Sequence, residues 1–410
     1  MTTALLLGGV LMLLAVTDTA VRRLPLSPAL LYLGIGWIAG ALLGSPGPET
    51  MLAAAPHAVG VTELVVLVSL VAVGLRLRVP PRLGAWAVAL RLAGPGMVAT
   101  MLFGACAAAV VLGLPWPAAL LLAAILAPTD PVLASEVQIR SGDDRDAVRL
   151  SLSAEGGLND GTALPGVMLA LGMLGLHTLG PWGSGWWWHD LVWPIGGGVA
   201  VGVVLGLGLG QVMLRRLAAG DPLARDELIY VGTVVLGYGV AQLTRTSTFV
   251  VAFCMGATLL MPLGRSDPGL ALSDRLHAFG ARIERLVESA MVLAIGVALH
   301  GIWPSPLQFV FAVVLVMLVR PLAVFAVVRG AHMPGHQRRL IAWFGIRGIG
   351  SLFYLAFALE HGVGGALAHT LVATTLACIA VSIVSHGVSA TPLMTRYQRR
   401  DARRPPSHGP

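Results

Sequence analysis

Residues 121–131 read LLAAILAPTDP, an apolar run that ends in two closely spaced prolines. The apolar part predicts a helix, but Pro128 and Pro131 lack an N–H, so two carbonyl oxygens of the preceding turn lose their helical donors. Pro131 also disfavours helical backbone at Asp130. We therefore expect a helix that breaks here and leaves free carbonyls beside the Thr129 hydroxyl and the Asp130 carboxylate. These are hard oxygen ligands, the kind that a dehydrated alkali cation requires.

The composition of the whole chain places this broken helix in a membrane. Of 410 residues, 56% are hydrophobic and only 11% are charged, whereas a soluble domain carries about a quarter charged residues. The net charge of +7 comes from arginines, since the chain has no lysine. These arginines form no basic stripe on a soluble domain, so we do not expect nucleic acid as a partner. The composition predicts an all-α, multi-pass membrane protein.

Thirteen segments are long and apolar enough to span a bilayer, which takes about 20 residues. Their expected bounds are 4–20, 26–45, 61–78, 86–113, 116–138, 146–177, 190–216, 227–243, 248–263, 282–300, 306–329, 338–361 and 366–390. The loops after the odd-numbered spans, with the tail, hold 23 arginines, and the other loops hold only Arg245. This alternation places the N-terminus outside the cell and the C-terminus, with a short tail at 391–410, in the cytoplasm.

Ionisable residues inside the expected spans are the candidates for function, because a charge at mid-depth costs at least ~2.5 kcal/mol. They are Asp130, Glu136, Glu155, Asp160, Glu288, Arg320 and Arg347. Glu63 and Arg91 lie nearer the ends of their spans, where snorkelling toward the interface is a sufficient explanation.

The sixth span contains the sequence EGGLNDGT at 155–162. Glu155 and Asn159 are four residues apart and share a helix face, while Asp160 is rotated by about 100° from Asn159. One helix can therefore direct Asp160 into a water-filled cavity and Glu155 toward a partner. Among the four charged residues Glu155, Glu288, Arg320 and Arg347, two internal ion pairs are possible. Asp130 and Asp160 are then left without a positive partner, free to hold either a proton or a metal cation.

The twelfth span reads FGIRGIGS at 344–351, and its three glycines around Arg347 predict a second interruption. Spans 5 and 12 differ by seven, as they would if spans 1–6 and 8–13 formed two inverted six-helix repeats. Paired broken helices in such halves indicate the binding site of a transporter.

These motifs resemble the monovalent cation/proton antiporter family, in particular its Na⁺/H⁺ exchanger branch with an Asn-Asp motif. Residues 129–132 match the Thr-Asp-Pro-Val motif of that branch, and residues 155–160 resemble its Glu-Ser-x-x-Asn-Asp motif. The segments at Arg320-Pro-Leu and Arg347-Gly resemble two arginine-bearing segments late in the family's chain. The resemblance covers almost the whole chain. Gly156 departs from the pattern, because it removes a serine hydroxyl that can serve as a cation ligand.

The resemblance implies the antiporter fold, with a core domain that moves against a dimerisation part in elevator-type alternating access. The core would comprise mainly spans 61–177 and those from 248–263 to 361, within a transmembrane domain at 1–390. Asp160 would carry Na⁺, K⁺ or H⁺, with Thr129 and Asp130 completing the cation site. Asn159 implies electroneutral exchange, and the pairs Glu155–Arg320 and Glu288–Arg347 would be structural bridges.

The resemblance also implies a homodimer in the cell (inner) membrane that serves pH homeostasis, without a cofactor and without enzymatic activity. Two alternatives remain open from the residues. The first is a transporter for another solute, such as an organic anion, with Arg320 or Arg347 as counter-charge. The second is an intramembrane aspartyl protease using Asp130 and Asp160, although the Gly-x-Gly-Asp segment of such enzymes is here Gly157-Leu-Asn-Asp.

Overall fold

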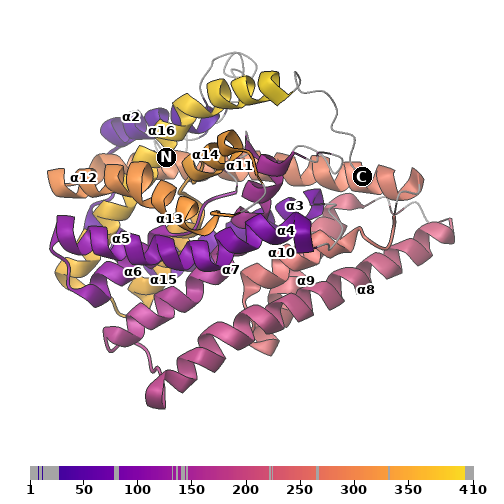
Figure 1. The fold of residues 1–410 in the computed structure, drawn as a ribbon, viewed down its shortest axis with the longest axis horizontal. Coiled ribbons are helices and arrows are strands. Elements are labelled where there is room, and N and C mark those ends of the chain that lie inside the picture. Colours follow the sequence, from indigo (N-terminus) through magenta and orange to yellow (C-terminus); the bar gives the residue numbers. More distant parts are fainter. Residues whose placement is uncertain are drawn as a thin grey trace.

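The computed structural model describes residues 8, 12, 27–77, 83–131, 133–134, 137–139, 144, 146–220, 223, 225–264, 267–330 and 333–401. Within these residues the regular structure is entirely helical (Figure 1), as the composition predicted. The first expected span, 4–20, lies outside the described residues apart from Gly8 and Met12, which are helical.

Most helices are long and several are joined through short π-helical segments, which the labels of Figure 1 keep separate. The first half contains α2 (Pro28–Leu43), α3 (Pro48–Arg76), α4 (Leu83–Arg91), η1 (Leu92–Gly96), α5 (Met97–Leu112), α6 (Trp116–Leu126), α7 (Ala147–Met173), η3 (Pro181–Gly183), η4 (Trp186–Gly197) and α8 (Gly198–Ala218). The second half contains α9 (Asp226–Thr244), α10 (Thr248–Leu259), α11 (Asp267–Gly301), α12 (Pro306–Val314), η5 (Leu315–Val319), α13 (Arg320–Val327), α14 (Gly335–Trp343), α15 (Ile349–Glu360) and α16 (Gly365–Asp401).

The prediction of a multi-pass helical membrane protein is confirmed by helix length and hydropathy. Six stretches of the described residues are long and apolar enough to cross a bilayer. They are Glu49–Arg76, Trp86–Leu112, Pro181–Ala218, Asp226–Thr244, Pro306–Val327 and Gly365–Arg400. The apolar helices α2, α6, α10 and α15 are shorter, and α7 and α11 carry buried acidic residues. The inverted-repeat symmetry of the two halves stays a prediction.

Both expected interruptions are present. Helix α6 ends at Leu126, and the backbone from 127 to 131 is not helical, as the two prolines require. The second break separates α14 from α15 at 344–348, within the glycine-rich segment. The two breaks meet, because the amide of Asp130 donates to the carbonyl of Ile346 at 2.7 Å.

Three helices extend beyond their expected bounds. Helix α3 begins at Pro48 instead of 61, α11 begins at Asp267 instead of 282, and α16 continues to Asp401. The criterion of continuous apolar sequence cut these helices short, because their polar ends are held by side-chain contacts. In α11, for example, Arg275 pairs with Asp226 of α9 at 2.8 Å. The longer α3 places Glu63 near the middle of a helix, which corrects the expectation that it lies near a span end.

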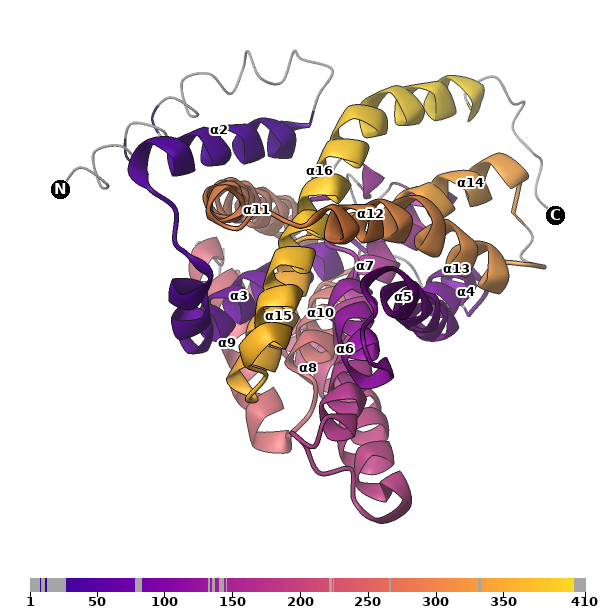
Figure 2. The ribbon, with the colours of Figure 1, turned by 90° about the vertical axis from the view of Figure 1, so that its left-hand side faces the viewer.

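Close backbone approach holds α10 between α3 and α8. A Cβ at Gly74 of α3 would collide with the backbone of α10, and one at Gly256 of α10 would collide with Val71 of α3. Small residues in membrane helices permit this kind of packing. Figure 1 shows α8 and α9 along one edge of the molecule, and Figure 2 shows α2 lying beside α11.

Candidate functional site

The Asp130 side chain links the first break to the second by hydrogen bonds. Its carboxylate accepts a hydrogen bond from the amide of Ile349, the first residue of α15, and another from the amide of Leu133 at 3.3 Å. A carboxylate at a helix N-terminus satisfies an unpaired N–H and interacts favourably with the helix dipole. Asp130 is 3% exposed. The structure therefore places this carboxylate as the cap of α15, in addition to any role toward a cation.

Arg347 neutralises the opposite kind of helix end. Its Nε donates to the carbonyl of Leu126, the last residue of α6, at 3.1 Å, and its Nη1 donates to the carbonyl of Gly345. A cation is favourable beside the unsatisfied carbonyls at a helix C-terminus. Arg347 makes no ion pair with Glu288 within the described residues, in contrast to the expected bridge. The physical reason is that the two breaks expose carbonyl oxygens directly beside the guanidinium.

Glu155 and Arg320 lie together, as expected. The guanidinium of Arg320, at the start of α13, meets the Glu155 carboxylate of α7 through two hydrogen bonds of 2.5 and 2.8 Å. Both side chains are buried, and Arg320 also donates to the carbonyl of Phe344 at 3.3 Å. This ion pair connects α7 to the second break. Because Arg320 is paired with Glu155, the structure does not favour Arg320 as the counter-charge for an anionic solute.

Asn159 and Thr129 form a direct link between α7 and the first break. The amide nitrogen Nδ2 of Asn159 donates to Oγ1 of Thr129 at 2.6 Å. The other end of the Asn159 side chain, Oδ1, is buried and receives no hydrogen bond from the described residues. A buried oxygen of this kind costs free energy unless something pairs with it. It is therefore available as a ligand.

Asp160 differs from every other buried acidic residue near the crossing. It is 1% exposed, and neither carboxylate oxygen receives a hydrogen bond from the part of the chain that the structure describes. The carboxylate faces Gly350 in the first turn of α15, where a Cβ would lie 2.5 Å from Oδ1. A Cβ at Gly348 would likewise meet the Asp130 carboxylate. Two glycines, two residues apart, thus make room for the two acidic side chains.

Three groups near the site were not identified from sequence. Ser351, beside Gly350, has a buried hydroxyl without a partner among the described residues. Tyr354 donates its hydroxyl to the backbone carbonyl of Asp160. Glu63, in mid-helix, accepts a hydrogen bond from Thr248 at 2.9 Å. Of these three residues, only Glu63 could have been recognised from the sequence, because it is a charged residue in a long apolar stretch.

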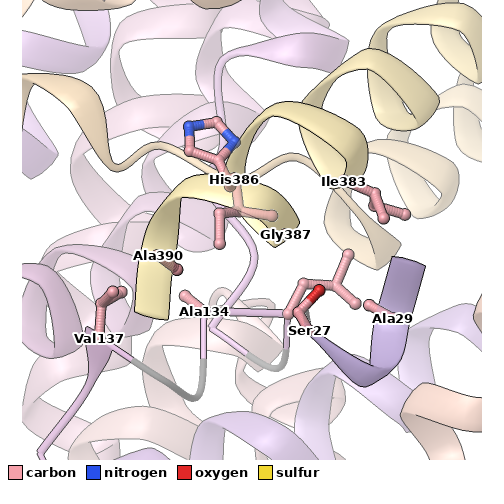
Figure 3. Close-up of a pocket in the computed structure, with 10 residues that line it drawn as sticks. Ser27, Ala29, Ala134, Val137, Ile383, His386, Gly387 and Ala390 are labelled. Carbon is pink, nitrogen blue, oxygen red and sulfur yellow. The ribbon is translucent and has the colours of Figure 1, made fainter. Parts of the chain in front are cut away.

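A small cavity lies beside the crossing, where α16 passes the start of α2 (Figure 3). Its volume is about 10 Å³, roughly the space for one water molecule. Figure 3 shows that the lining side chains come from the start of α2 (Ser27), the segment after the first break (Ala134, Val137) and α16 (His386). The cavity is too small for a hydrated alkali cation.

The oxygen atoms without partners define what the site can bind. Among the described residues these include the Asp160 carboxylate and the Asn159 amide oxygen on α7 and the Ser351 hydroxyl at the start of α15, and the Asp160 carboxylate faces that first turn. Hard oxygen ligands suit alkali cations, and the carboxylate alone can instead take a proton. A multi-pass protein with such groups beside two crossing interrupted helices belongs to the class of secondary ion transporters.

Comparison with known proteins agrees with this class. A family model described as "Sodium/hydrogen exchanger, transmembrane" matches residues 9–396. The chain belongs to the sodium/hydrogen exchanger family. This is a family of transporters, not enzymes, so the alternative of an aspartyl protease is wrong.

One curated relative and two solved structures show how far the similarity extends. The relative, "K(+)/H(+) antiporter NhaP" of Alkalimonas amylolytica, is 27% identical over 401 residues, which are 95% of this chain and 66% of that protein. The chain thus spans just under two thirds of its length. Two structures of the sodium proton antiporter MjNhaP1 of Methanocaldococcus jannaschii share the fold at 20% identity. The first, at pH 8, has a TM-score of 0.72 and covers 97% of this chain and 98% of that one. The second, from electron microscopy, has a TM-score of 0.78 and covers 99% of both.

Proposed function

We propose that this protein exchanges a monovalent cation, Na⁺ or K⁺, for a proton across the cell membrane. The observation that carries the proposal is the buried Asp160 carboxylate, which no hydrogen bond from the described residues satisfies. The family membership and the names of the relatives, a K⁺/H⁺ antiporter and a sodium proton antiporter, support the same activity.

The exchange follows from competition at one carboxylate. Asp160 holds either the cation or a proton, and occupancy by one displaces the other. Thr129, Asn159 and Asp130 border the site and supply further oxygens when the cation binds. Because position 159 is a neutral asparagine, Asp160 is the carboxylate at which the cation and the proton replace each other. One cation then replaces one proton, and the transport cycle is electroneutral.

Alternating access would occur by an elevator-type movement of the helices that carry the site. A cavity of about 210 Å³ is lined by residues of α3, α11, α15 and α16. Its lining is almost entirely apolar and includes Met51, Met291, Leu355 and Leu376. Apolar contacts offer no directional bonds to break when one surface slides along another. The moving part would comprise α7, α15 and both breaks.

The arginine distribution supports an orientation with the N-terminus outside and the C-terminus in the cytoplasm, in the inner membrane of a cell. A homodimer and a role in pH homeostasis complete the proposal. They rest on the family resemblance of the sequence motifs.

The experiment is transport by the purified protein in liposomes that contain a pH-sensitive dye. A proton gradient is imposed, and Na⁺, K⁺ or Li⁺ is added outside. We expect a cation-dependent collapse of the gradient that does not change when the membrane potential is clamped, and no collapse with Asp160→Ala. Asp226→Asn, which removes a partly exposed carboxylate far from the breaks, is the matched control. Absence of cation-dependent collapse in the unmodified protein, or full activity of Asp160→Ala, would reject the proposal.

A further inference from the structure

A second buried ion pair lies away from the crossing, where α3 ends against α11. Arg76, in the last turn of α3, donates to Oε2 of Glu284 in α11. Glu284 is 7% exposed, and Arg76 is nearly as well buried. Glu284 was not among the candidates drawn from the sequence, although it lies within the expected span 282–300. The structure places it near the middle of a helix that begins at Asp267.

This pair differs in geometry from Glu155–Arg320. There both carboxylate oxygens receive a guanidinium nitrogen. At Glu284 only Oε2 is paired, and Oε1 is buried and receives no hydrogen bond from the described residues. An unpaired oxygen on a buried carboxylate is costly, and a positive charge in its neighbourhood lowers that cost.

Glu284 is electrostatically linked to the candidate site. The charged groups that act on it are Arg76, the neighbouring Arg285 and the carboxylate of Asp130. The hydroxyl of Tyr230 also lies near this pair but donates to the carbonyl of Val68 at 2.7 Å. The pair therefore lies within electrostatic range of the crossing, on the side that we propose to be cytoplasmic.

We propose that the Arg76–Glu284 pair sets the electrostatic potential at the cytoplasmic approach to Asp130 and Asp160, and so the apparent affinity for the transported cation. This inference rests on the proposed function. Glu284 attracts the monovalent cation through its negative charge, and Arg76 limits that attraction so that the cation is released toward Asp160. The pair is thus a charge-balancing element and not only a link between α3 and α11.

The test compares Glu284→Gln with the double variant Arg76→Gln/Glu284→Gln in liposomes, with cation supplied from the proposed cytoplasmic side. The single variant leaves Arg76 unbalanced, so KM for the cation should rise roughly tenfold, as expected for a charge that repels substrate from a low-dielectric approach. The maximal rate should stay within about twofold. The double variant restores the net charge of the unmodified pair, so KM should return close to its original value. Added impermeant salt should shrink the difference, because it screens charges.

A purely structural ion pair predicts a different pattern, because both variants lose the same bond. KM would then be equally affected in both, or more affected in the double variant, and that result would overturn the inference. An unchanged KM in Glu284→Gln would do the same. Apparent melting temperatures in detergent establish that both variants fold, and Asp226→Asn, which breaks the α9–α11 pair with Arg275, is the control. If the unmodified protein shows no exchange at all, the proposed function fails instead.

Discussion

Asp130 and Asp160 are both buried carboxylates at the crossing of the two breaks, yet their surroundings are opposite. The Asp130 carboxylate accepts hydrogen bonds from two backbone amides, one of them at the start of α15. The Asp160 carboxylate accepts none from the described residues, although it faces the same turn of the same helix. Other buried charged groups at the crossing also have partners. Glu155 pairs with Arg320, and Arg347 donates to a carbonyl at the end of α6.

This difference distinguishes carboxylates that stabilise the fold from a carboxylate that binds and releases ions. A group that is saturated by backbone hydrogen bonds stabilises the fold and resists a change of partner, because any change leaves a buried amide unpaired. A group without partners gains from whatever binds it, and so it responds to the concentrations of cation and proton. The groups that have partners thus hold the two broken helices in position, and Asp160 can exchange a bound cation for a proton.

The largest effect on stability should come from substitutions in the buried ion pair Glu155–Arg320. Glu155→Gln leaves Arg320 buried without its counter-charge, so we expect a loss of ~3–5 kcal/mol. Chemical denaturation in detergent measures it. Asp226→Asn also breaks an ion pair but at a partly exposed site, and it should cost no more than about 1 kcal/mol. Equal losses in the two variants would contradict the distinction between the buried crossing and the surface.

A smaller effect distinguishes the two aspartates directly. Asp130→Ala removes the cap of α15 and should destabilise the protein by ~1–3 kcal/mol. Asp160→Asn removes no hydrogen bond from the described residues and takes a charge out of a buried site, so the protein should be no less stable. The apparent melting temperatures of both variants, measured in the absence of Na⁺ and K⁺, test this contrast. A fall with Asp160→Asn as large as that with Asp130→Ala would show that Asp160 is also structural.

The smallest effect concerns Gly156, the position at which the motif that this sequence resembles has serine. A Cβ at this position would lie 3.4 Å from the Pro131 side chain and 3.6 Å from the carbonyl of Thr129, so a serine fits. Its hydroxyl adds one oxygen near the cation site, and the ratio of KM for Na⁺ to that for K⁺ should fall by roughly threefold, about the value of one hydrogen bond. The added oxygen should lower the KM for Na⁺ more than the KM for K⁺. Na⁺ is the more strongly hydrated ion and therefore interacts more strongly with an oxygen ligand. Parallel transport assays with the two cations measure the ratio.

Gly157→Ser is the matched control for this prediction. A Cβ there would collide with the ring of Phe253, so this variant should lose stability without a specific change in the KM ratio. An unchanged ratio in Gly156→Ser, with normal stability, would show that position 156 does not face the cation.

Much of the fold was predictable because backbone chemistry acts locally. Pro128 and Pro131 interrupt their helix in any tertiary context, and glycines around Arg347 weaken the second one in the same way. The ends of the helices were less predictable. Glu63 lies near the middle of α3, which begins at Pro48 and not at 61, and α11 begins at Asp267 and not at 282. Polar helix ends are stabilised by neighbours that the local sequence does not reveal.

The sequence by itself determined that this chain is a helical membrane protein, where its two helices break, and which acidic and basic residues are too costly to bury without a purpose. Those properties depend on hydropathy and on missing N–H donors, which are fixed residue by residue. Only the tertiary structure decided which charge meets which partner. Among the described residues, Arg347 donates to the carbonyls of the broken helices and not to Glu288, Asp130 caps α15, and Asp160 receives no hydrogen bond. These choices depend on distances between segments far apart in the chain, and such distances exist only after the helices have packed.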